Sequence, residues 1–218
     1  LLLLILAEPV LTVRITSLLR PSLWVLFDGT DSMAVADDMP EDERARLTAA
    51  VGLSQHDKAA AKADSASRLS RAEYVKAMVK KEEGNLLARL AEKCRIRAFL
   101  FDRPEGVRGL ELASATETKL DPKRVADQLT TDGQTTALGA ALDDLARRHA
   151  TSNLAGLVIV SDFNQNAGPP AVEAARRLGA SAYTIGVGPT AAADVGVDLQ
   201  APPVMKKDER STLVATIR

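Results

Sequence analysis

The chain has 218 residues, of which 46% are hydrophobic and 26% charged, a balance typical of a globular protein. Its 28 basic and 29 acidic side chains give a formal net charge of −1, so no overall field would recruit nucleic acid or anionic lipid. Aromatic residues are only 3%, which argues against base-stacking platforms, and the single Cys94 excludes an internal disulfide and any multi-cysteine metal site.

The N-terminal stretch is apolar from Leu1 to Ala7. Seven residues cannot span a bilayer, which needs about 20. The stretch nevertheless resembles the last turns of a transmembrane helix, and a buried strand or helix is the alternative. We expect residues 1–20 to be the end of such a helix plus a linker, with a possible short strand at Val10–Ile15. This predicts a protein anchored in the cell membrane, and the side of the membrane stays open.

The first predicted strand is Leu23–Phe27, a continuous apolar run that ends abruptly in polar residues. Such a run is typical of a buried parallel strand. Asp28, Thr30 and Ser32 follow it at alternating positions, and ligand sites of open α/β sheets lie at the edge where such strands end. Carboxylate and hydroxyl oxygens suit Mg²⁺ or Mn²⁺ better than zinc.

Residues 37–69 differ in composition from the rest. They are acidic at first and then rich in Ala, Lys and Ser, with few large apolar side chains. This predicts a solvated, partly helical insertion beside the Asp28 loop. His56 lies within it, and a lone histidine there is expected to face solvent. At its end, Ser70 and Glu73 have the spacing of a capping box, which predicts a helix start.

The rest of the chain alternates strand and helix patterns. Gly84-Asn85 interrupts the helix after Ser70, and Cys94, at the end of the resumed apolar pattern, is expected to be a buried, unreactive thiol. Further strands are predicted at Ile96–Phe101, Gly109–Ala113 (at an edge), Leu154–Val160, Ala182–Val187 and Ser211–Arg218, and helices at Asp121–Leu129, Leu138–Ala150 and Pro169–Leu178. This alternation predicts an α/β fold, a Rossmann-like, doubly wound and mainly parallel sheet with helices on both faces.

Three polar loops are expected at the same sheet edge. The first carries Asp28, Thr30 and Ser32, the second carries Thr135 or Thr136, and the third carries Asp162 after the most apolar strand. Two carboxylates in one cleft repel each other unless a cation or proton intervenes. A divalent ion would relieve this repulsion, although each residue taken alone could instead be a helix cap.

These elements resemble the von Willebrand factor type A (VWA) family. Asp28-Gly29-Thr30-Asp31-Ser32-Met33 is similar to the Asp-x-Ser-x-Ser element of its metal-ion-dependent adhesion site (MIDAS), Thr136 to Leu142 to its Thr before a central helix, Val160-Ser161-Asp162 to its acidic turn, and Tyr183 to Gly188 to its late Ile-Gly-x-Gly strand. The resemblance covers residues 21–190. Residues 191–218 are then expected to be a linker and the first strand of a following β domain.

The resemblance implies a metal site formed by Asp28, Thr30, Ser32, Thr136 and Asp162. It implies that the Thr30 and Ser32 hydroxyls ligate Mg²⁺ (or Mn²⁺) directly, that Thr136 does so directly or through water, and that the two aspartates act mainly through waters. The remaining position would accept an acidic side chain of a protein partner. Thr30 replaces the family's first Ser, and Phe163 replaces the usual Gly and is expected to add an apolar side chain to the rim.

Two other functions compete with this hypothesis. The run VLFDGTDS superficially resembles haloacid-dehalogenase-type phosphatases, but Leu26 stands where their nucleophilic aspartate lies, and the chain has no Walker loop or nucleophile elbow. We therefore expect neither catalysis nor a small-molecule substrate. The other alternative is a degenerate VWA domain that has lost its metal and serves as a structural spacer.

Overall fold

The computed structural model describes residues 20–53, 68–113, 120–148, 153–189, 197–202, 204, 207 and 212–217. The expected anchor over residues 1–19, the strand at Val10–Ile15 and His56 lie outside these residues. The chain divides into two compact units, and the boundary between them falls after Val187. In the described part of the chain, no helix is long and apolar enough to cross a membrane.

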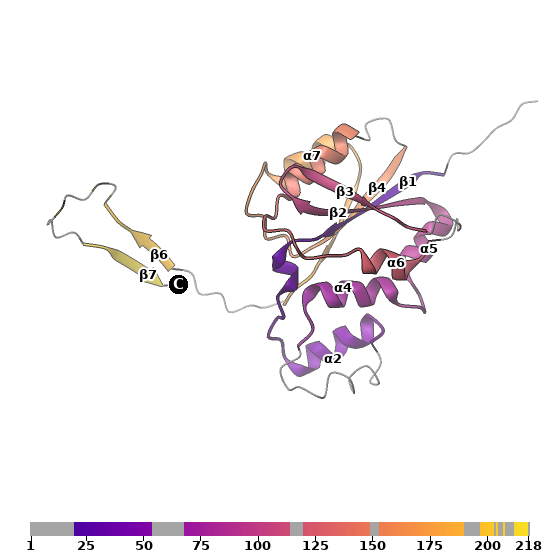
Figure 1. Ribbon diagram of the computed structural model, residues 1–218, viewed down its shortest axis with the longest axis horizontal. Coiled ribbons are helices and arrows are strands. Elements are labelled where there is room, and N and C mark those ends of the chain that lie inside the picture. Colours follow the sequence, from indigo (N-terminus) through magenta and orange to yellow (C-terminus); the bar gives the residue numbers. More distant parts are fainter. Residues whose placement is uncertain are drawn as a thin grey trace, which may run out of the picture. The chain divides into compact units, whose positions relative to one another are not determined.

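A five-stranded sheet forms the centre of the first unit (Figure 1). The central strand β1 (Ser22–Asp28) pairs in parallel with both of its neighbours, and the strand order is β3-β2-β1-β4-β5. The other strands are β2 (Arg95–Arg103), β3 (Gly106–Leu110), β4 (Leu154–Ser161) and β5 (Ala182–Gly186). Only β3 is antiparallel, at one edge. The predicted fold class, a mainly parallel α/β sheet flanked by helices, is confirmed.

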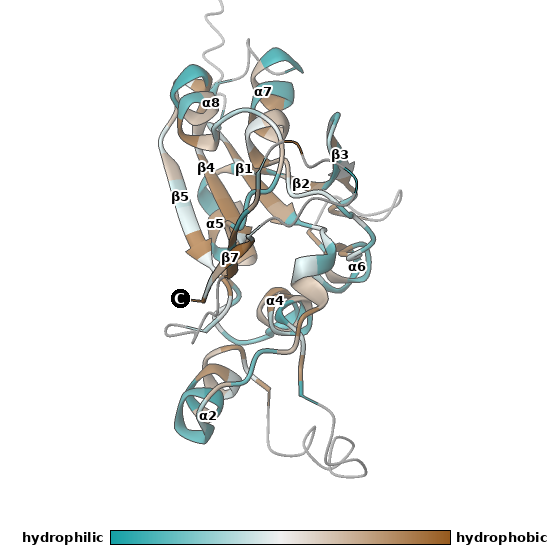
Figure 2. Cartoon of the chain, turned by 90° about the vertical axis from the view of Figure 1, so that its left-hand side faces the viewer, coloured by the Kyte–Doolittle hydropathy of each residue, from teal (hydrophilic) through white to brown (hydrophobic). Residues whose placement is uncertain are grey.

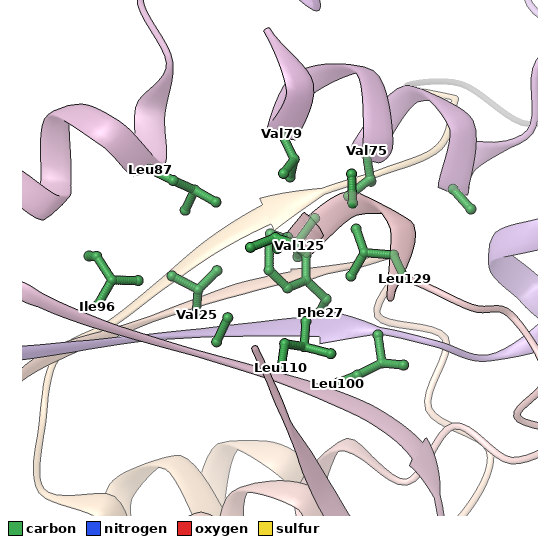
Figure 3. Packing of buried hydrophobic residues seen from close by; sticks show 14 of the residues in the cluster. Val25, Phe27, Val75, Val79, Leu87, Ile96, Leu100, Leu110, Val125 and Leu129 are labelled. Carbon is green, nitrogen blue, oxygen red and sulfur yellow. The ribbon is translucent and has the colours of Figure 1, made fainter. Parts of the chain in front are cut away.

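Helices cover both faces of this sheet, and their apolar sides meet those of β1. Val25 and Phe27 belong to the hydrophobic cluster on one face, whereas Trp24 and Leu26 belong to the cluster on the other. The first face packs against α4 (Arg71–Lys80), α5 (Leu86–Lys93) and α6 (Pro122–Asp127), as Figure 3 shows, and the second packs against α7 (Leu138–Arg148) and α8 (Ala171–Leu178). The unbroken apolar pattern of β1 therefore reflects burial on both sides.

Local signals read from the sequence set several helix ends. Ser70 and Glu73 form the predicted capping box at the start of α4. Asn85 caps α5 by accepting a bond from the Ala88 amide, so the break at Gly84-Asn85 separates two helices. Gly179 ends α8 with a left-handed φ of 69°, the conformation that favours glycine at this position.

Two local predictions were wrong. The edge strand lies at Gly106–Leu110 rather than at Gly109–Ala113, because the chain reverses at Pro104 and pairs with β2 almost immediately. Cys94 is half-buried at the end of α5 rather than buried, with its side chain against the rim of the first cluster.

Residues 31–53 lead away from the sheet edge. A short 3-10 turn, η1 (Asp31–Ala34), follows the first loop and buries Met33 in the core. Helix α2 (Glu41–Ala50) comes next, and its hydrophilic surface contrasts with the apolar strand β4 in Figure 2. The only buried residue of α2 is Thr48, so the first unit of the fold does not depend on this helix for its core.

The second unit contains an antiparallel pair of strands, β6 (Val197–Gln200) and β7 (Val214–Ile217). Strand β7 lies within the strand predicted at Ser211–Arg218, whereas β6 was not predicted. Both strands are exposed along their whole length.

Candidate metal centre

The first polar loop folds around the carboxylate of Asp28 at the end of β1. Asp28 Oδ1 accepts a hydrogen bond from the Thr30 amide over 3.0 Å and one from the Thr30 hydroxyl over 2.7 Å. An aspartate that accepts from the amide two residues later forms a tight local turn. The Thr30 hydroxyl also lies 3.0 Å from the Ser32 hydroxyl. The alternation of Asp28, Thr30 and Ser32 thus brings three oxygen-bearing side chains together.

Backbone hydrogen bonds join this loop to the second polar loop. The Asp31 amide donates to the Gly133 carbonyl over 2.6 Å, and the Gly133 amide donates to the Gly29 carbonyl over 3.0 Å. Thr30 and Gly133 form an isolated parallel bridge, which extends the pairing of β1 beyond its last residue. Only glycine fits at 133, because a Cβ there would lie 2.6 Å from the Asp102 carbonyl oxygen.

The second loop brings Thr136 to the site. Its hydroxyl donates to Thr30 Oγ1 over 3.2 Å, although the two residues are 106 positions apart. The Thr136 amide donates to Asn166 Oδ1, and α7 begins two residues later, at Leu138. We call Thr30, Ser32 and Thr136 the hydroxyl cluster; Thr30 and Thr136 are buried and Ser32 is half-buried.

The spacing within the hydroxyl cluster fits a small divalent ion. An octahedral Mg²⁺ with ligands at about 2.0–2.1 Å holds neighbouring ligand oxygens about 2.9 Å apart. The separations from Thr30 Oγ1 to the Ser32 and Thr136 hydroxyls are 3.0 and 3.2 Å. Each of these two separations is therefore close to that of adjacent ligands. No group of three His, Cys, Asp or Glu side chains suited to a metal occurs among the described residues.

Asp28 places a carboxylate beside the hydroxyl cluster, in hydrogen-bond contact with Thr30. It is 5% exposed, and its Oδ2 accepts a hydrogen bond from the Ser161 hydroxyl over 2.5 Å. Burial raises the pKa of Asp28 above its ordinary value, although the bonds from Ser161 and Thr30 oppose the shift and the nearby charge of Asp162 adds to it. A cation next to Asp28 would favour the ionised form. Sequence reasoning missed Ser161, because it read only the acidic residue of this turn.

Asp162 occupies the third loop and forms an ion pair. Its Oδ2 accepts from Nη1 of Arg71 over 2.7 Å, and its Oδ1 accepts from the Asn164 amide over 3.1 Å. No hydrogen bond joins Asp162 directly to the hydroxyl cluster in the described residues; the same Nη1 of Arg71 reaches the Ser32 carbonyl over 3.4 Å. Asp28, Thr30, Ser32 and Thr136 thus form one bonded network, and Asp162 is linked to it through Arg71.

Arg71 is a second residue at this site that sequence reasoning missed. Its Nε and Nη2 form a bidentate pair with Asp37 over 2.7 and 2.6 Å, and its amide donates to the Val35 carbonyl. The pKa of Arg71 lies above its ordinary value, chiefly because Asp37 accepts these bonds and despite the opposing effect of burial. The residues around Arg71 do not indicate these contacts, because Arg71 stands inside a capping box and its acidic partners lie 34 and 91 positions away.

Phe163 follows Asp162 and is the only non-glycine residue of the described chain with a positive φ, 59°. This left-handed conformation explains a glycine at the corresponding position of VWA domains. The half-buried side chain packs against the second hydrophobic cluster. The Phe163 amide donates to the Ser161 hydroxyl, which in turn bonds Asp28. The turn therefore keeps its shape despite the Phe.

Comparisons with known proteins give similarity in structure. No protein-family model matches the chain, and no curated protein matches its sequence. Among solved structures, it is similar to an aerotolerance-related membrane protein of Bacteroides fragilis, with 15% identity and a TM-score of 0.46 over 90% of this chain and 81% of that one. It is also similar to proximal thread matrix protein 1 of the mussel byssus, in a structure with a zinc-occupied MIDAS motif, with 17% identity and a TM-score of 0.44. That match covers 77% of this chain and 38% of the mussel protein.

Proposed function

We propose that this chain is a VWA-type domain that binds a divalent cation and, through it, an acidic side chain of a partner protein. The observation that carries the proposal is the hydroxyl cluster, in which three hydroxyls from two loops lie 3.0 and 3.2 Å apart beside a buried carboxylate. Four sequence elements in the order of the VWA family support it. The mainly parallel sheet, which ends its strands at this edge, is compatible with it.

The residues of the site divide into two roles. Thr30 and Ser32 would supply hydroxyl oxygens directly, and Thr136 directly or through water. Asp28 and Asp162 would act mainly through waters, because their oxygens already accept bonds from Thr30, Ser161, Arg71 and Asn164. A bound Mg²⁺ or Mn²⁺ supplies positive charge and an open coordination position. Ser32, the half-buried member of the cluster, lies on the side from which a partner's carboxylate would approach.

The charges around the site agree with a divalent ion. With their carboxylates ionised, Asp28, Asp37 and Asp162 carry three negative charges, and Arg71 carries one positive charge. The remainder is −2, which one divalent ion would balance. Buried charge that is left unbalanced is costly, and either a bound cation or a proton on Asp28, whose pKa is raised by burial, would reduce it.

Membrane anchoring forms the second part of the proposal. The apolar Leu1 to Ala7 motivates a tether ahead of the domain, which would enter it at the amino end of β1, opposite the end that carries Asp28. The test expresses two proteins, the full natural chain and a fluorescent reporter that carries residues 1–20 at its N-terminus. The distribution of each between membrane and supernatant fractions is then measured. Retention of the full chain in the supernatant would contradict the anchor.

An enzymatic role has less support. Leu26, at the position of the phosphatase nucleophile, is fully buried in the second hydrophobic cluster and carries no reactive group. The metal-free structural alternative has one observation in its favour, since Arg71 already pairs with Asp162. Metal titration separates this alternative from the proposal.

The test is calorimetric titration of the chain with Mg²⁺ and with Mn²⁺. Wild type is expected to bind one ion, and Ser32→Ala to weaken binding at least about tenfold by removing a direct ligand. Asp31→Asn is the matched control, because Asp31 lies on the same loop but is exposed and outside the bonded network. It should change affinity by less than about threefold, because water and salt screen the exposed charge of Asp31. Absence of heat and of any thermal shift with both ions would overturn the proposal.

A further inference from the structure

Arg71 holds a cationic group at the edge of the candidate metal centre. Its guanidinium lies between two carboxylates, with 2.6 and 2.7 Å bonds to Asp37 and a 2.7 Å bond to Asp162. All three side chains are largely withdrawn from water, with exposed fractions of 14% for Arg71, 8% for Asp37 and 3% for Asp162. Because water screens buried charges poorly, the positive charge of Arg71 acts strongly on its surroundings.

The same guanidinium is connected to the hydroxyl cluster. Its Nη1 reaches the carbonyl of Ser32, a residue whose hydroxyl belongs to that cluster. The backbone amide of Arg71 also bonds Val35, so the first turn of α4 is fixed to the segment that follows Ser32. Arg71 therefore has a set position beside the site rather than a choice of surface rotamers.

We infer that Arg71 is a built-in cation that neutralises Asp162 while the site holds no metal and that lowers the affinity of the site for a divalent ion. The inference rests on the proposed function, since it assigns a regulating residue to the same site. Two positive charges close together repel, and both require the carboxylate of Asp162. Asp37 moderates this effect because its negative charge offsets part of the positive charge of Arg71.

The inference makes Arg71 and Asp37 act in opposite directions, although they are partners in one ion pair. Arg71→Gln removes a positive charge and is expected to tighten metal binding about tenfold. Asp37→Asn removes a negative charge and frees Arg71 to act on the site, so it is expected to weaken binding by a similar factor. A purely structural ion pair would give changes of the same sign, because either substitution breaks the same contacts.

The experiment is calorimetric titration with Mn²⁺ at fixed ionic strength. It uses wild type, Arg71→Gln, Asp37→Asn and Arg71→Lys; the last keeps the charge but not the bidentate fork, and its affinity should lie closer to that of wild type than the affinity of Arg71→Gln does. Arg177→Gln is the matched control, because Arg177 forms an equally bidentate pair with Asp143 on the exposed surface of α7 and α8. Its affinity should equal that of wild type.

The outcomes separate the inference from the proposed function. Tighter binding by Arg71→Gln together with weaker binding by Asp37→Asn supports both. Binding by wild type with equal or weaker binding by Arg71→Gln overturns the inference alone. Binding by Arg71→Gln without binding by wild type supports the inference and overturns the proposed function for the natural chain. Absence of binding in every protein overturns both.

A second readout does not depend on the metal-bound protein. In a chelator, Arg71→Gln leaves Asp37 and Asp162 without their cation and is expected to lower the melting temperature, as followed by emission of the buried Trp24. Should this variant not fold, the double variant Arg71→Gln/Asp37→Asn removes one of the two unpaired carboxylates. It is expected to bind Mn²⁺ more tightly than Asp37→Asn alone, and equal or weaker binding would overturn the inference.

Discussion

The hydroxyls of Thr30 and Thr136 lie 3.2 Å apart and join two loops that are 106 positions apart in the chain. Neither hydroxyl is needed to fill the core, because a methyl group of the same size would pack as well. Under the proposed function, these buried positions meet a demand for oxygen atoms. Such a demand is what a metal ligand set imposes on a protein interior.

Replacement of Thr136 by Val tests this demand. The substitution keeps the side-chain shape and removes the hydroxyl, so metal affinity measured by calorimetry should fall at least about tenfold. The cost in free energy of unfolding should be only about 1 kcal/mol, the usual net value of one hydrogen bond. Thr135→Val is the matched control, because its hydroxyl is outside the bonded network, and it should leave affinity unchanged. Equal losses for the two variants would contradict the assignment of Thr136.

The pH dependence of stability tests the burial of Asp28. A raised pKa means that the folded chain holds the proton more firmly than the unfolded chain, whose value is near 3.8. The resulting stabilisation is fully present below pH 3.8 and is lost as pH rises through the folded value. Asp28→Asn removes this loss. In a chelator, its melting temperature relative to wild type should therefore increase from pH 4 to pH 7.

This comparison isolates position 28, because all other carboxylates are common to the two proteins. A difference in melting temperature that stays constant or decreases between pH 4 and pH 7 would contradict the burial effect. Metal affinity of wild type should fall on acidification over the same range, since a proton and a cation compete for Asp28.

The left-handed backbone of Phe163 predicts an unusual order of stability for variants at this position, with Gly more stable than Ala. A non-glycine residue in this conformation costs roughly 1–2 kcal/mol, which its side-chain packing offsets with about 1–2 kcal/mol for a half-buried Phe. Phe163→Gly loses both terms and should be close to wild type in urea denaturation. Phe163→Ala keeps the strain and loses the packing, so it should be less stable than Phe163→Gly by about 1 kcal/mol. The reverse order would show that the turn is not strained.

Gly139 permits the close approach of α7 to the segment before α8. A Cβ at this position would lie 1.9 Å from the Pro169 carbonyl oxygen, a backbone atom that cannot move alone. Gly139→Ala should therefore lower the free energy of unfolding by about 1–3 kcal/mol, the range for overpacking, despite the better helix propensity of Ala. Gly186→Ala is the control, because a Cβ there meets no atom within 4 Å. Similar melting temperatures for the two variants would contradict this packing.

Periodicity and turn chemistry predicted the sheet and its helices because those signals are local. The apolar run of β1, the capping box at Ser70 and the left-handed Gly179 each act within a few residues, and each was read correctly. The edge strand β3 was misplaced, since its register depends on pairing with β2 rather than on its own pattern. Strand β6 was missed for the same reason, because it is defined by its pairing with β7.

The candidate site was predictable where oxygen-bearing residues recur in one loop, and not where it depends on distant partners. Thr136 was chosen over Thr135 because the residues that follow it resemble the VWA pattern, and its hydroxyl does bond that of Thr30. Arg71 could not be recognised, because a guanidinium reaches its partners through a long side chain whose direction the sequence does not encode. Ser161 was missed because its hydroxyl turns inward to Asp28 while its neighbour Asp162 faces Arg71.

The bridge between Thr30 and Gly133 has a consequence for how such a domain evolves. The two loops are held by main-chain hydrogen bonds, which no side-chain replacement at Thr30 or Ser32 removes. Under the proposed function, loss of a single hydroxyl would therefore weaken metal binding in one mutational step while the loops keep their place. Recovery is equally simple, because the scaffold that orients the missing ligand persists. Strongly and weakly binding versions of such a domain would thus differ by one substitution, which adds or removes a single oxygen atom.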